Sequence, residues 1–305
     1  MGVDRQVEVD GRELKLTNLD KALYPKAGFS KGEVIDYYAK VAPAMIPHLA
    51  GRALTLRRFP EGVDDSEGAF FEKRCPKHRP EWVKTARVPA GPKTGEIDYC
   101  VCEDLPTLTW MAQLASIELH PSLSRAKRLD RPTVLAFDLD PGTPADVLDC
   151  CRVAMRLREL FGHFEVECFP KTSGSKGLQV YVPLNNDEVT YEETKPLARA
   201  IAQLLEKQTP KDVVSKMKKA ERKGKVFVDW SQNHETKTTI AVYSLRARER
   251  PTVSTPVTWK EVERALDRED SESLVFEAGD VLKRVDKHGD LFAPVLELKQ
   301  ELPEL

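Results

Sequence analysis

The sequence predicts an α+β fold (mixed α/β) built from two parts, and three observations lead to this class. The chain has 305 residues, which corresponds to about two domains of ordinary size. Some segments alternate apolar and polar residues with the period of a strand, whereas others repeat apolar residues with the period of a helix. The two kinds of segment are mixed along the chain, with a strand hairpin near its centre, and this order is typical of α+β architectures.

The first 125 residues predict a smaller α/β module. Asp10-Gly11 lies between two alternating segments, as in a hairpin turn, and Ser30 and Glu33 have the spacing of a capping box at a helix start. The expected elements are a hairpin at 7–16, a helix at 31–49, strands at 54–58 and 70–73, and a helix at 105–119. A charged, proline-containing stretch follows at 125–132, so we expect two domains, 1–125 and 126–305.

The second domain shows a more regular order of elements. Val147, Cys151, Ala154, Leu157 and Phe161 recur at steps of three and four residues, which predicts a helix with one buried face. The expected elements are a strand at 133–139, a helix at 144–161, strands at 164–169 and 178–183 around a polar loop at 171–177, a helix at 192–207, a strongly basic helix at 211–222, and strands at 226–230 and 238–244.

Composition and charge are those of a globular protein and give no direct sign of a nucleic-acid ligand. The chain has 47 basic and 49 acidic residues, a net charge of −2. It has neither the apolar N-terminal core of a secretory signal nor an apolar run of membrane-spanning length. A chain of this size needs no disulfides, so we expect reduced thiols and a cytoplasmic protein. Cys75 and His78 have only half of a zinc-site spacing.

Paired carboxylates at a strand end are the first sign of chemistry. Asp138 and Asp140 alternate in a strand, so both side chains project from the same face. Two neighbouring carboxylates raise each other's pKa, and a divalent cation such as magnesium or manganese removes that penalty. Asp229 ends another short apolar strand, and three such carboxylates suit a two-metal centre. Alternatively, Asp140 only begins a turn and the other two aspartates face solvent.

A second sign is the loop Lys171-Thr172-Ser173-Gly174-Ser175-Lys176-Gly177 between two expected strands. Small residues let backbone N–H groups approach an anion, and the serine and lysine side chains add donors, so the loop suits a phosphate group. It does not match the P-loop pattern, and it is equally interpreted as a plain hairpin turn. Basic residues gather at 211–225 and 246–250, either as a solvated surface or as a track for a nucleic-acid backbone.

Together these motifs resemble those of the polymerase domain of bacterial DNA ligase D, in the archaeo-eukaryotic primase superfamily. The resemblance rests on three regions in order and covers nearly the whole chain: residues 137–142, residues 173–177, and residues 229–233 followed by 237–248. It implies a primase-type palm with an RRM-like sheet plus a smaller N-terminal α/β module. No ligase or nuclease region is present in 305 residues, so the chain resembles a stand-alone primase-polymerase or an excised domain.

The resemblance also implies roles for particular residues. Asp138, Asp140 and Asp229 would be catalytic and would hold two manganese (or magnesium) ions, with His120 near the metal centre. The residues matched to nucleotide binding are Ser173, Ser175, Lys176, Gln179, Gln232 and Arg246. Many relatives have histidine where this chain has Gln179. Because histidine can be a cationic donor and glutamine cannot, we expect Gln179→His to tighten nucleotide binding.

Four residues of the first domain match DNA contacts of the family. Lys21 and Lys26 would grip the 5′-phosphate across a gap, and Phe70 and Phe71 would stack against the template. On the sequence alone, both lysines are interpreted as surface residues, the phenylalanines as core, and His120 equally well as a buried structural histidine.

The function implied by the resemblance is template-dependent nucleotidyl transfer. The enzyme would add NTPs or dNTPs to a primer 3′-hydroxyl at gaps or breaks during DNA repair, by end joining or gap filling. The expected partners are gapped or broken DNA with a 5′-phosphate, with Ku and a separate DNA ligase as candidate proteins. We expect a monomer in the cytoplasm, associated with the nucleoid and not with a membrane. Two alternatives remain: a catalytically silent DNA-end-binding module and a metal-dependent phosphodiesterase.

Overall fold

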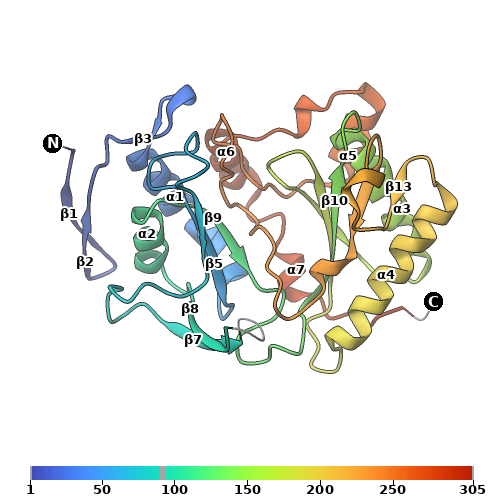
Figure 1. Ribbon diagram of the computed structural model, residues 1–305, viewed down its shortest axis with the longest axis horizontal. Coiled ribbons are helices and arrows are strands. Elements are labelled where there is room, and N and C mark those ends of the chain that lie inside the picture. The colour runs from blue at the N-terminus through green and yellow to red at the C-terminus, as the bar shows by residue number, and fades with distance from the viewer. Residues whose placement is uncertain (1, 90–93, 304–305) are drawn as a thin grey trace. The chain divides into compact units, whose positions relative to one another are not determined.

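The computed structural model describes residues 2–89 and 94–303, which group into two compact units (Figure 1). Unit 1 contains the chain up to Ser122 together with Thr238–Ser254 and Glu277–Asp290. Unit 2 contains Leu123–Lys237, Thr255–Phe276 and the chain from Leu291 onward. The sequence predicts one domain boundary near residue 125, whereas the chain passes from unit 2 back to unit 1 twice, at Thr238 and at Glu277. Those two segments pack on the N-terminal elements, so the two units cannot be separated by one boundary along the sequence.

Unit 1 combines small sheets with three helices. Its elements are β1 (Arg5–Val9), β2 (Arg12–Leu16), β3 (Ala22–Tyr24), β4 (Phe29–Ser30), α1 (Lys31–Leu49), β5 (Leu54–Arg58), β6 (Phe70–Glu72), β7 (Thr85–Pro89), β8 (Glu96–Cys100), α2 (Leu105–Gln113), β9 (Ser116–Pro121) and α6 (Ala278–His288). The main sheet has the order β6-β5-β8-β7, with β9 also paired to β5. The predicted hairpin and capping box are confirmed, since Ser30 and Glu33 cap each other's backbone at the start of α1.

The helix predicted at 105–119 is wrong in its second half. Helix α2 ends at Gln113, and Ala115 has a left-handed backbone conformation with φ of +56°. The chain then enters strand β9, where Ile117 and Leu119 are buried and antiparallel pairing with β5 replaces helical hydrogen bonds. His120 therefore projects from a strand, next but one to Glu118.

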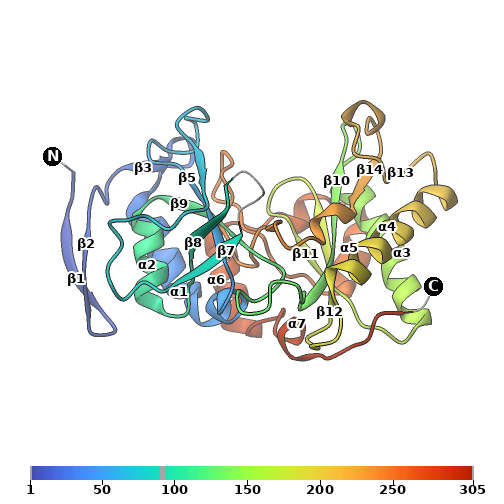
Figure 2. The same ribbon diagram turned by 60° about the horizontal axis from the view of Figure 1, so that its bottom comes forward.

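Unit 2 is built on a five-stranded sheet with the order β11-β12-β10-β14-β13 (Figure 2). The elements of the unit are β10 (Val134–Pro141), α3 (Val147–His163), β11 (Phe169–Thr172), β12 (Leu178–Pro183), α4 (Tyr191–Gln208), β13 (Val213–Val214), β14 (Val226–Asp229), α5 (Trp259–Arg268) and α7 (Pro294–Glu297). Neighbouring strands are antiparallel except β13 and β14, which are parallel.

One face of this sheet forms the core of unit 2. Leu135, Phe137 and Leu139 alternate along β10 and pack into a single apolar cluster with side chains of α3, α4 and α5. The same cluster includes Val180 of β12 and Val228 of β14. Because successive residues of a strand face opposite ways, the residues between these apolar ones project from the other face, which leaves that face for polar chemistry.

Three further predicted elements, all in the second half of the chain, differ from the structure. The basic segment 211–222 is not a helix, because Val213 and Val214 extend the sheet edge as β13 beside β14. The strand predicted at 164–169 lies later, as β11, so Lys171 and Thr172 belong to a strand and the polar loop is shorter. Residues 238–244 form one isolated bridge, between Thr238 and Ser122, and no regular strand.

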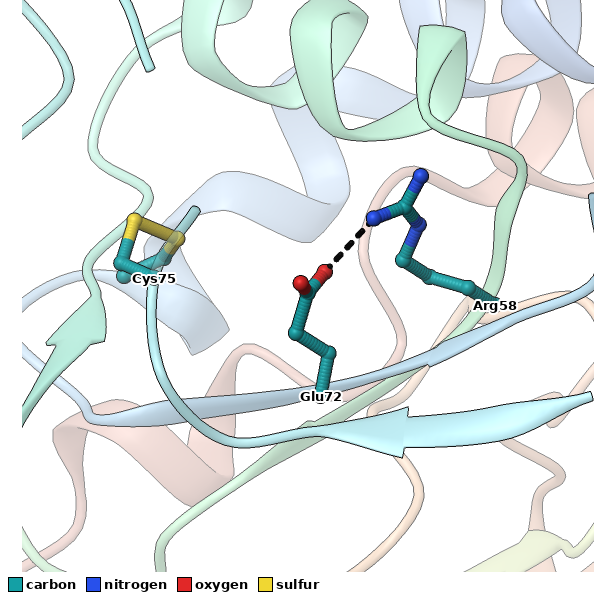
Figure 3. Close-up of a disulfide and its surroundings, with 4 residues drawn as sticks. Arg58, Glu72 and Cys75 are labelled. Atoms are coloured by element: carbon teal, nitrogen blue, oxygen red, sulfur yellow. Dashed lines mark hydrogen bonds and ion pairs between the residues drawn. A yellow bond between two sulfur atoms is a disulfide. The ribbon is translucent and has the colours of Figure 1, made fainter. Parts of the chain in front are cut away.

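The expectation of fully reduced thiols is also wrong. Cys75 and Cys100 form a disulfide, whereas the remaining four cysteines (Cys102, Cys150, Cys151 and Cys168) are free and buried. A separation of 25 residues gives no hint of this pairing, which Figure 3 shows. In the fold, the backbone N–H of Cys75 also donates to the carbonyl of Asp98 of β8 at 2.7 Å, so the segment around Cys75 lies against β8. Among the described residues, every helix is too short or too polar to cross a membrane.

Candidate active site

A row of four polar residues crosses the face of the unit 2 sheet that lies opposite the apolar core. Lys171 of β11 pairs with Gln179 of β12, Gln179 with Asp138 of β10, and Asp138 with Asp229 of β14. Cross-strand partners project from the same face, so the four side chains stand next to one another in this order. Asp140 lies two residues beyond Asp138 on the same face and is exposed. The structure therefore brings together the three aspartates that the sequence singled out.

The electrostatics of this row are dominated by its carboxylates. Burial, followed by the negative charge of Asp140, raises the pKa of Asp138 from 3.8 to about 7. The hydrogen bond from Gln179 lowers the pKa of Asp138, and so does the positive charge of Lys171, whereas the negative charge of Asp229 raises it further. Gln179 and Lys171 together do not offset the effects of burial and of the neighbouring carboxylates on Asp138, so the site favours an added positive charge.

Asp229 is held in place by the residues that follow it. Its Oδ1 accepts hydrogen bonds from the backbone N–H and the hydroxyl of Ser231, at 3.0 and 2.6 Å. Its Oδ2 accepts one from Nε2 of Gln232, at 2.8 Å. Asn233, fully buried, exchanges two side-chain hydrogen bonds with the backbone of Ala136 on β10. The 229–233 segment thus fixes both the carboxylate and the strand beside it.

The loop between β11 and β12 is folded by its own serine. Ser173 is buried, and its hydroxyl oxygen accepts hydrogen bonds from the backbone N–H groups of Ser175 and Gly177, at 3.2 and 3.1 Å. Those two N–H groups are therefore used within the loop. Lys176 is exposed at its tip. We interpret Ser173 as the residue that shapes the loop, and Ser175 and Lys176 as the predicted phosphate ligands.

Gly177 brings this loop against the aspartate-bearing strand. A Cβ atom at position 177 would lie 2.2 Å from the carbonyl oxygen of Leu139, which lies between Asp138 and Asp140. Glycine is thus required here for the close approach of two backbones. As a result, the Ser-Gly-Ser-Lys loop and the carboxylates occupy the same end of the sheet.

The basic segment of unit 2 joins the same strand end. The backbone N–H of Gly142 donates to Lys225, and that of Gly224 donates to Gly142, both at 2.8 Å. The guanidinium of Arg222 lies over the ring of Phe227, whose backbone pairs with Asp140. The basic residues that the sequence suggested as a nucleic-acid track therefore begin beside the carboxylates.

The donor set fits a divalent metal, although no cage is preformed. Asp138, Asp140 and Asp229 supply only oxygen ligands on one face, as magnesium and manganese prefer. Among the described residues, no three His, Cys, Asp or Glu side chains converge closely enough to form a metal site.

Gln179 and Lys171 take positions that the sequence did not reveal. Both side chains are buried, with exposures of 2% and 1%. Gln179 donates its amide to Asp138, whereas its Oε1 has no hydrogen-bond partner among the described residues. The predicted contact of Gln179 with a triphosphate thus competes with its hydrogen bond to Asp138. Lys171 lies on the far side of Gln179 and is a buried positive charge that the sequence analysis left in a loop.

Unit 1 contains a second charged cluster, centred on Glu118. Its Oε1 accepts hydrogen bonds from Nε of Arg246 and the backbone N–H of Ala247, both at 3.1 Å. Its Oε2 lies 3.0 Å from Nε2 of His120 and 3.3 Å from Nη1 of Arg57. Glu118 is 1% exposed. The predicted residues His120 and Arg246 are thus anchored on one carboxylate that the sequence analysis did not single out.

Burial and charge act in opposite directions in this cluster. Burial raises the pKa of Glu118, but the hydrogen bond from His120 and the charge of Arg246 outweigh it, so the pKa lies well below its usual range. Burial also lowers the pKa of His120, against the opposing effect of Glu118. At neutral pH we therefore expect an ionised Glu118 that fixes the guanidinium of Arg246.

The two predicted phosphate lysines differ in their surroundings. Lys26 is exposed and paired with Glu249, whereas Lys21 pairs with Glu61 at 2.6 Å. Lys31, which the sequence analysis passed over, is buried at the first position of α1, and its backbone N–H donates to Lys21. Burial, then the charge of Lys21, lowers the pKa of Lys31 to about 8. Lys31 therefore lies near Lys21 at the start of α1, where Glu33 caps the helix.

Phe70 and Phe71 are exposed on the edge strand β6, as template-stacking residues need to be. Their exposures are 42% and 59%, and each ring has an arginine of β5 over it, Arg58 at 5.3 Å and Arg57 at 5.2 Å. Phe71 also meets His120 edge to face, with ring centroids 5.7 Å apart. The alternative of two core phenylalanines is wrong.

A sheet that carries three aspartates beside a loop of small, hydroxyl and lysine residues suits metal-assisted phosphoryl chemistry, of which nucleotidyl transfer is one class. Comparison with known families supports this class: the family described as "LigD, primase-polymerase domain" matches residues 30–292. The chain belongs to this family, and it is a nucleotidyltransferase. The resemblance, the fold class and the enzyme class expected from the sequence are confirmed.

Individual relatives agree. The multifunctional non-homologous end joining protein LigD of Mycolicibacterium smegmatis is 43% identical over 284 residues, which cover 92% of this chain and 36% of the relative. The bifunctional LigD protein of Bacillus subtilis is 32% identical over 95% of this chain and 45% of the relative. The chain therefore spans less than half the length of these proteins. Among solved structures, the polymerase domain from Mycobacterium tuberculosis ligase D in complex with DNA matches with a TM-score of 0.84 and 40% identity, covering 94% of this chain and 99% of that one.

Proposed function

We propose that this chain adds NTPs or dNTPs to a primer 3′-hydroxyl at gaps or breaks in DNA, as the polymerase of a repair reaction such as end joining or gap filling. The observation that carries the proposal is the direct pairing of Asp138 with Asp229 beside Gln179 and the Ser-Gly-Ser-Lys loop. The relatives support the repair context, because they are non-homologous end joining proteins and one solved relative was determined with DNA.

Two manganese or magnesium ions are the cofactors we propose, held by Asp138, Asp140 and Asp229, with His120 as the further metal residue that the resemblance implies. When bound, such ions lower the pKa of an attacking hydroxyl and neutralise the charge on the leaving pyrophosphate. The protein's own contribution is to hold Asp229 through Ser231 and Gln232, which keeps one carboxylate directed across the strand pair. The uncompensated charge at Asp138 supplies the affinity for a cation.

Nucleotide binding is assigned to the donor residues that the family resemblance matches to the nucleotide. Lys176 and Ser175 at the loop tip would bind the triphosphate, with Ser173 shaping the loop and Gln232 linking the pocket to Asp229. Arg246 would add a guanidinium whose orientation is set by Glu118. Hydrogen bonds from a guanidinium or an ammonium group to phosphate oxygens are about twice as strong as those between neutral groups.

DNA binding is assigned to the positive and aromatic groups of both units. Lys21, Lys26 and Lys31 would bind a 5′-phosphate. Phe70 and Phe71 would stack on template bases. The segment around Arg222 and Lys225 would follow the DNA backbone near Asp140. We propose a monomer that works in the cytoplasm at the nucleoid, with Ku and a separate DNA ligase as candidate partners.

The test is a single incubation with three readouts. A duplex with a short gap and a labelled primer is mixed with the protein, manganese and either NTPs or dNTPs, with a 5′-phosphate or a 5′-hydroxyl across the gap. We expect primers lengthened by one or a few nucleotides, with release of pyrophosphate and a preference for the 5′-phosphate. Shortened primers would instead indicate a phosphodiesterase, and binding without any change of primer length would indicate a silent end-binding module.

A further inference from the structure

The segment 243–246 of unit 1 carries Arg246, and its backbone is strained at Tyr243. Tyr243 is 2% exposed and has φ of +65°, a left-handed conformation that a bulky residue adopts rarely and at a cost. Its hydroxyl donates to Oδ1 of Asp290 at 2.6 Å, and Oδ2 of Asp290 lies 2.8 Å from Nε2 of His48. Such strain persists only where the surrounding structure fixes it, and it is frequent at ligand sites.

Buried tyrosine hydroxyls bind both ends of this segment. The hydroxyl of Tyr37 donates to the backbone carbonyl of Tyr243 at 2.8 Å, and that of Tyr24 donates to the backbone carbonyl of Arg246 at 3.0 Å. Tyr37 is 1% exposed and Tyr24 is fully buried. Because the two hydroxyls come from α1 and β3, the segment is held by elements that lie 206 and 222 residues earlier in the chain.

A third tyrosine joins the middle of the segment to strand β9. The hydroxyl of Tyr38 accepts from the backbone N–H of Leu245 at 3.1 Å and donates to the carbonyl of Ile117 at 2.5 Å. The next residue of β9 is Glu118, whose carboxylate binds the side chain of Arg246. Burial raises the pKa of all three tyrosines, so their hydroxyls keep their protons at neutral pH. The backbone and the side chain of Arg246 are therefore both fixed.

We infer that Tyr24, Tyr37 and Tyr38 are positioning residues of the nucleotide site. Their hydroxyl groups hold the backbone at 243–246, so that Arg246 presents its guanidinium to the nucleotide in one orientation. They act through Arg246 and not by contact with the nucleotide. A group that is already fixed loses little conformational freedom when its ligand binds, which increases the affinity. The inference rests on the proposed function, because it takes Arg246 as a ligand of the nucleotide.

The experiment removes one hydroxyl at a time and measures the kinetics of primer extension on gapped, 5′-phosphorylated DNA with manganese. We expect Tyr24→Phe to raise KM for the nucleotide about three- to tenfold, as for the loss of one neutral hydrogen bond. The change in kcat and in the affinity for the DNA should stay below about twofold, because only binding of the nucleotide is weakened. Tyr37→Phe is the second variant and should raise KM in the same way.

Arg246→Ala shows whether the tyrosines act through Arg246. Arg246→Ala alone should raise KM, and Tyr24→Phe added to it should raise KM no further, since the effects of residues that act through one group are not additive. A tyrosine with a merely structural role would lower the free energy of unfolding and leave KM unchanged. An unchanged KM in Arg246→Ala itself would refute the assignment of Arg246 to the nucleotide, and the inference with it.

The matched control is Tyr99→Phe, in strand β8 of the same unit. The hydroxyl of Tyr99 forms no hydrogen bond with the residues that the structure describes, so its removal should leave KM at the wild-type value. The inference is overturned if Arg246→Ala raises KM while Tyr24→Phe and Tyr37→Phe do not, or if the effects of Tyr24→Phe and Arg246→Ala add up. It is also overturned if Tyr24→Phe weakens binding of the DNA instead of the nucleotide, or if Tyr99→Phe raises KM as much.

Discussion

Asp138 of β10 lies directly opposite Asp229 of β14 in the antiparallel pairing of the two strands. Like charges opposite each other destabilise a sheet, and here a third carboxylate, Asp140, stands on the same face. Such an arrangement persists in a folded protein when it has a use that outweighs its cost to stability. In this family of nucleotidyltransferases the proposed use is to hold the cations of the reaction.

The first prediction concerns the stability of the metal-free protein. The pKa of Asp138 is raised to about 7 in the folded state, so between about pH 4 and pH 7 the folded chain binds more protons than the unfolded one. Stability conferred by this site therefore falls as the pH rises. Asp138→Asn should increase the free energy of unfolding at pH 8 in EDTA by about 1–2 kcal/mol, while abolishing nucleotide addition. Denaturant unfolding and primer extension measure the two effects.

A neutral comparison is Asp187→Asn, because the Asp187 side chain is 83% exposed and makes only a long surface ion pair with Arg128. That variant should match the wild-type protein in both assays. If Asp138→Asn is instead less stable than the wild-type protein at pH 8, Asp138 does not suffer the repulsion inferred here.

The second prediction tests the contact between the loop and β10. In Gly177→Ala, the new Cβ would lie 2.2 Å from the carbonyl oxygen of Leu139, so the loop must move away. We expect a loss of about 1–3 kcal/mol in stability and weaker nucleotide binding. Gly162→Ala is the matched control, since its Cβ meets nothing within 4 Å and the position lies in helix α3, where alanine is favoured. Equal nucleotide affinities for the two variants would count against the loop as the triphosphate site.

The third prediction is a pH dependence of 5′-phosphate recognition. Lys31 has a pKa lowered to about 8, so it is charged at pH 7 and loses its proton as the pH rises further. The preference for a 5′-phosphate over a 5′-hydroxyl should therefore decrease between about pH 7.5 and 9.5. Lys31→Arg should retain the preference over that range, because arginine stays protonated.

Binding titrations with the two DNA ends at several pH values measure this effect, with Lys26→Arg as a control that should follow the wild-type profile. A wild-type preference that is constant up to pH 9.5 would show that Lys31 does not contact the phosphate.

The fourth prediction concerns Glu118. In Glu118→Gln, one oxygen that accepts from the neighbouring donors becomes an NH₂ group that faces them, and the charge that fixes Arg246 is lost. Because breaking a buried ion pair leaves its partner uncompensated, we expect a stability loss of about 2–4 kcal/mol. Steady-state kinetics should show KM for the nucleotide raised at least about tenfold, with a smaller change in kcat.

The companion variant is Glu103→Gln, which removes a surface ion pair with Lys84 in the same unit and should change neither property. An unchanged KM in Glu118→Gln would mean that Arg246 does not depend on this carboxylate, or does not contact the nucleotide.

Much of the fold follows from local sequence signals. The helix at 31–49 has a capping box that starts it, and Asp138 and Asp140 alternate with Phe137 and Leu139 on a strand whose buried face is fully apolar. These features depend on neighbours a few residues apart, so the pattern of the sequence contains them. For the same reason, Asp138 and Asp140 could be predicted to project from the same face of one strand.

Other features depend on partners far along the chain. Glu118 lies on strand β9, where the sequence predicts the end of a helix, and it binds Arg246, which is 128 residues away along the chain. Local sequence therefore gave no sign that Glu118 anchors Arg246. The disulfide, the burial of Lys31 beside Lys21, and the row from Lys171 to Asp229 likewise depend on tertiary pairing. Periodicity gives no information on which strands become neighbours, so these contacts were not predictable from it.

The most direct test of the account is primer extension on gapped, 5′-phosphorylated DNA with manganese, comparing the wild-type protein with Asp138→Ala and Asp229→Asn. We predict that the wild-type protein adds nucleotides, while both variants add none and bind the same DNA with unchanged affinity. Extension by either variant at more than about one hundredth of the wild-type rate would contradict the assignment of this carboxylate pair as the catalytic centre.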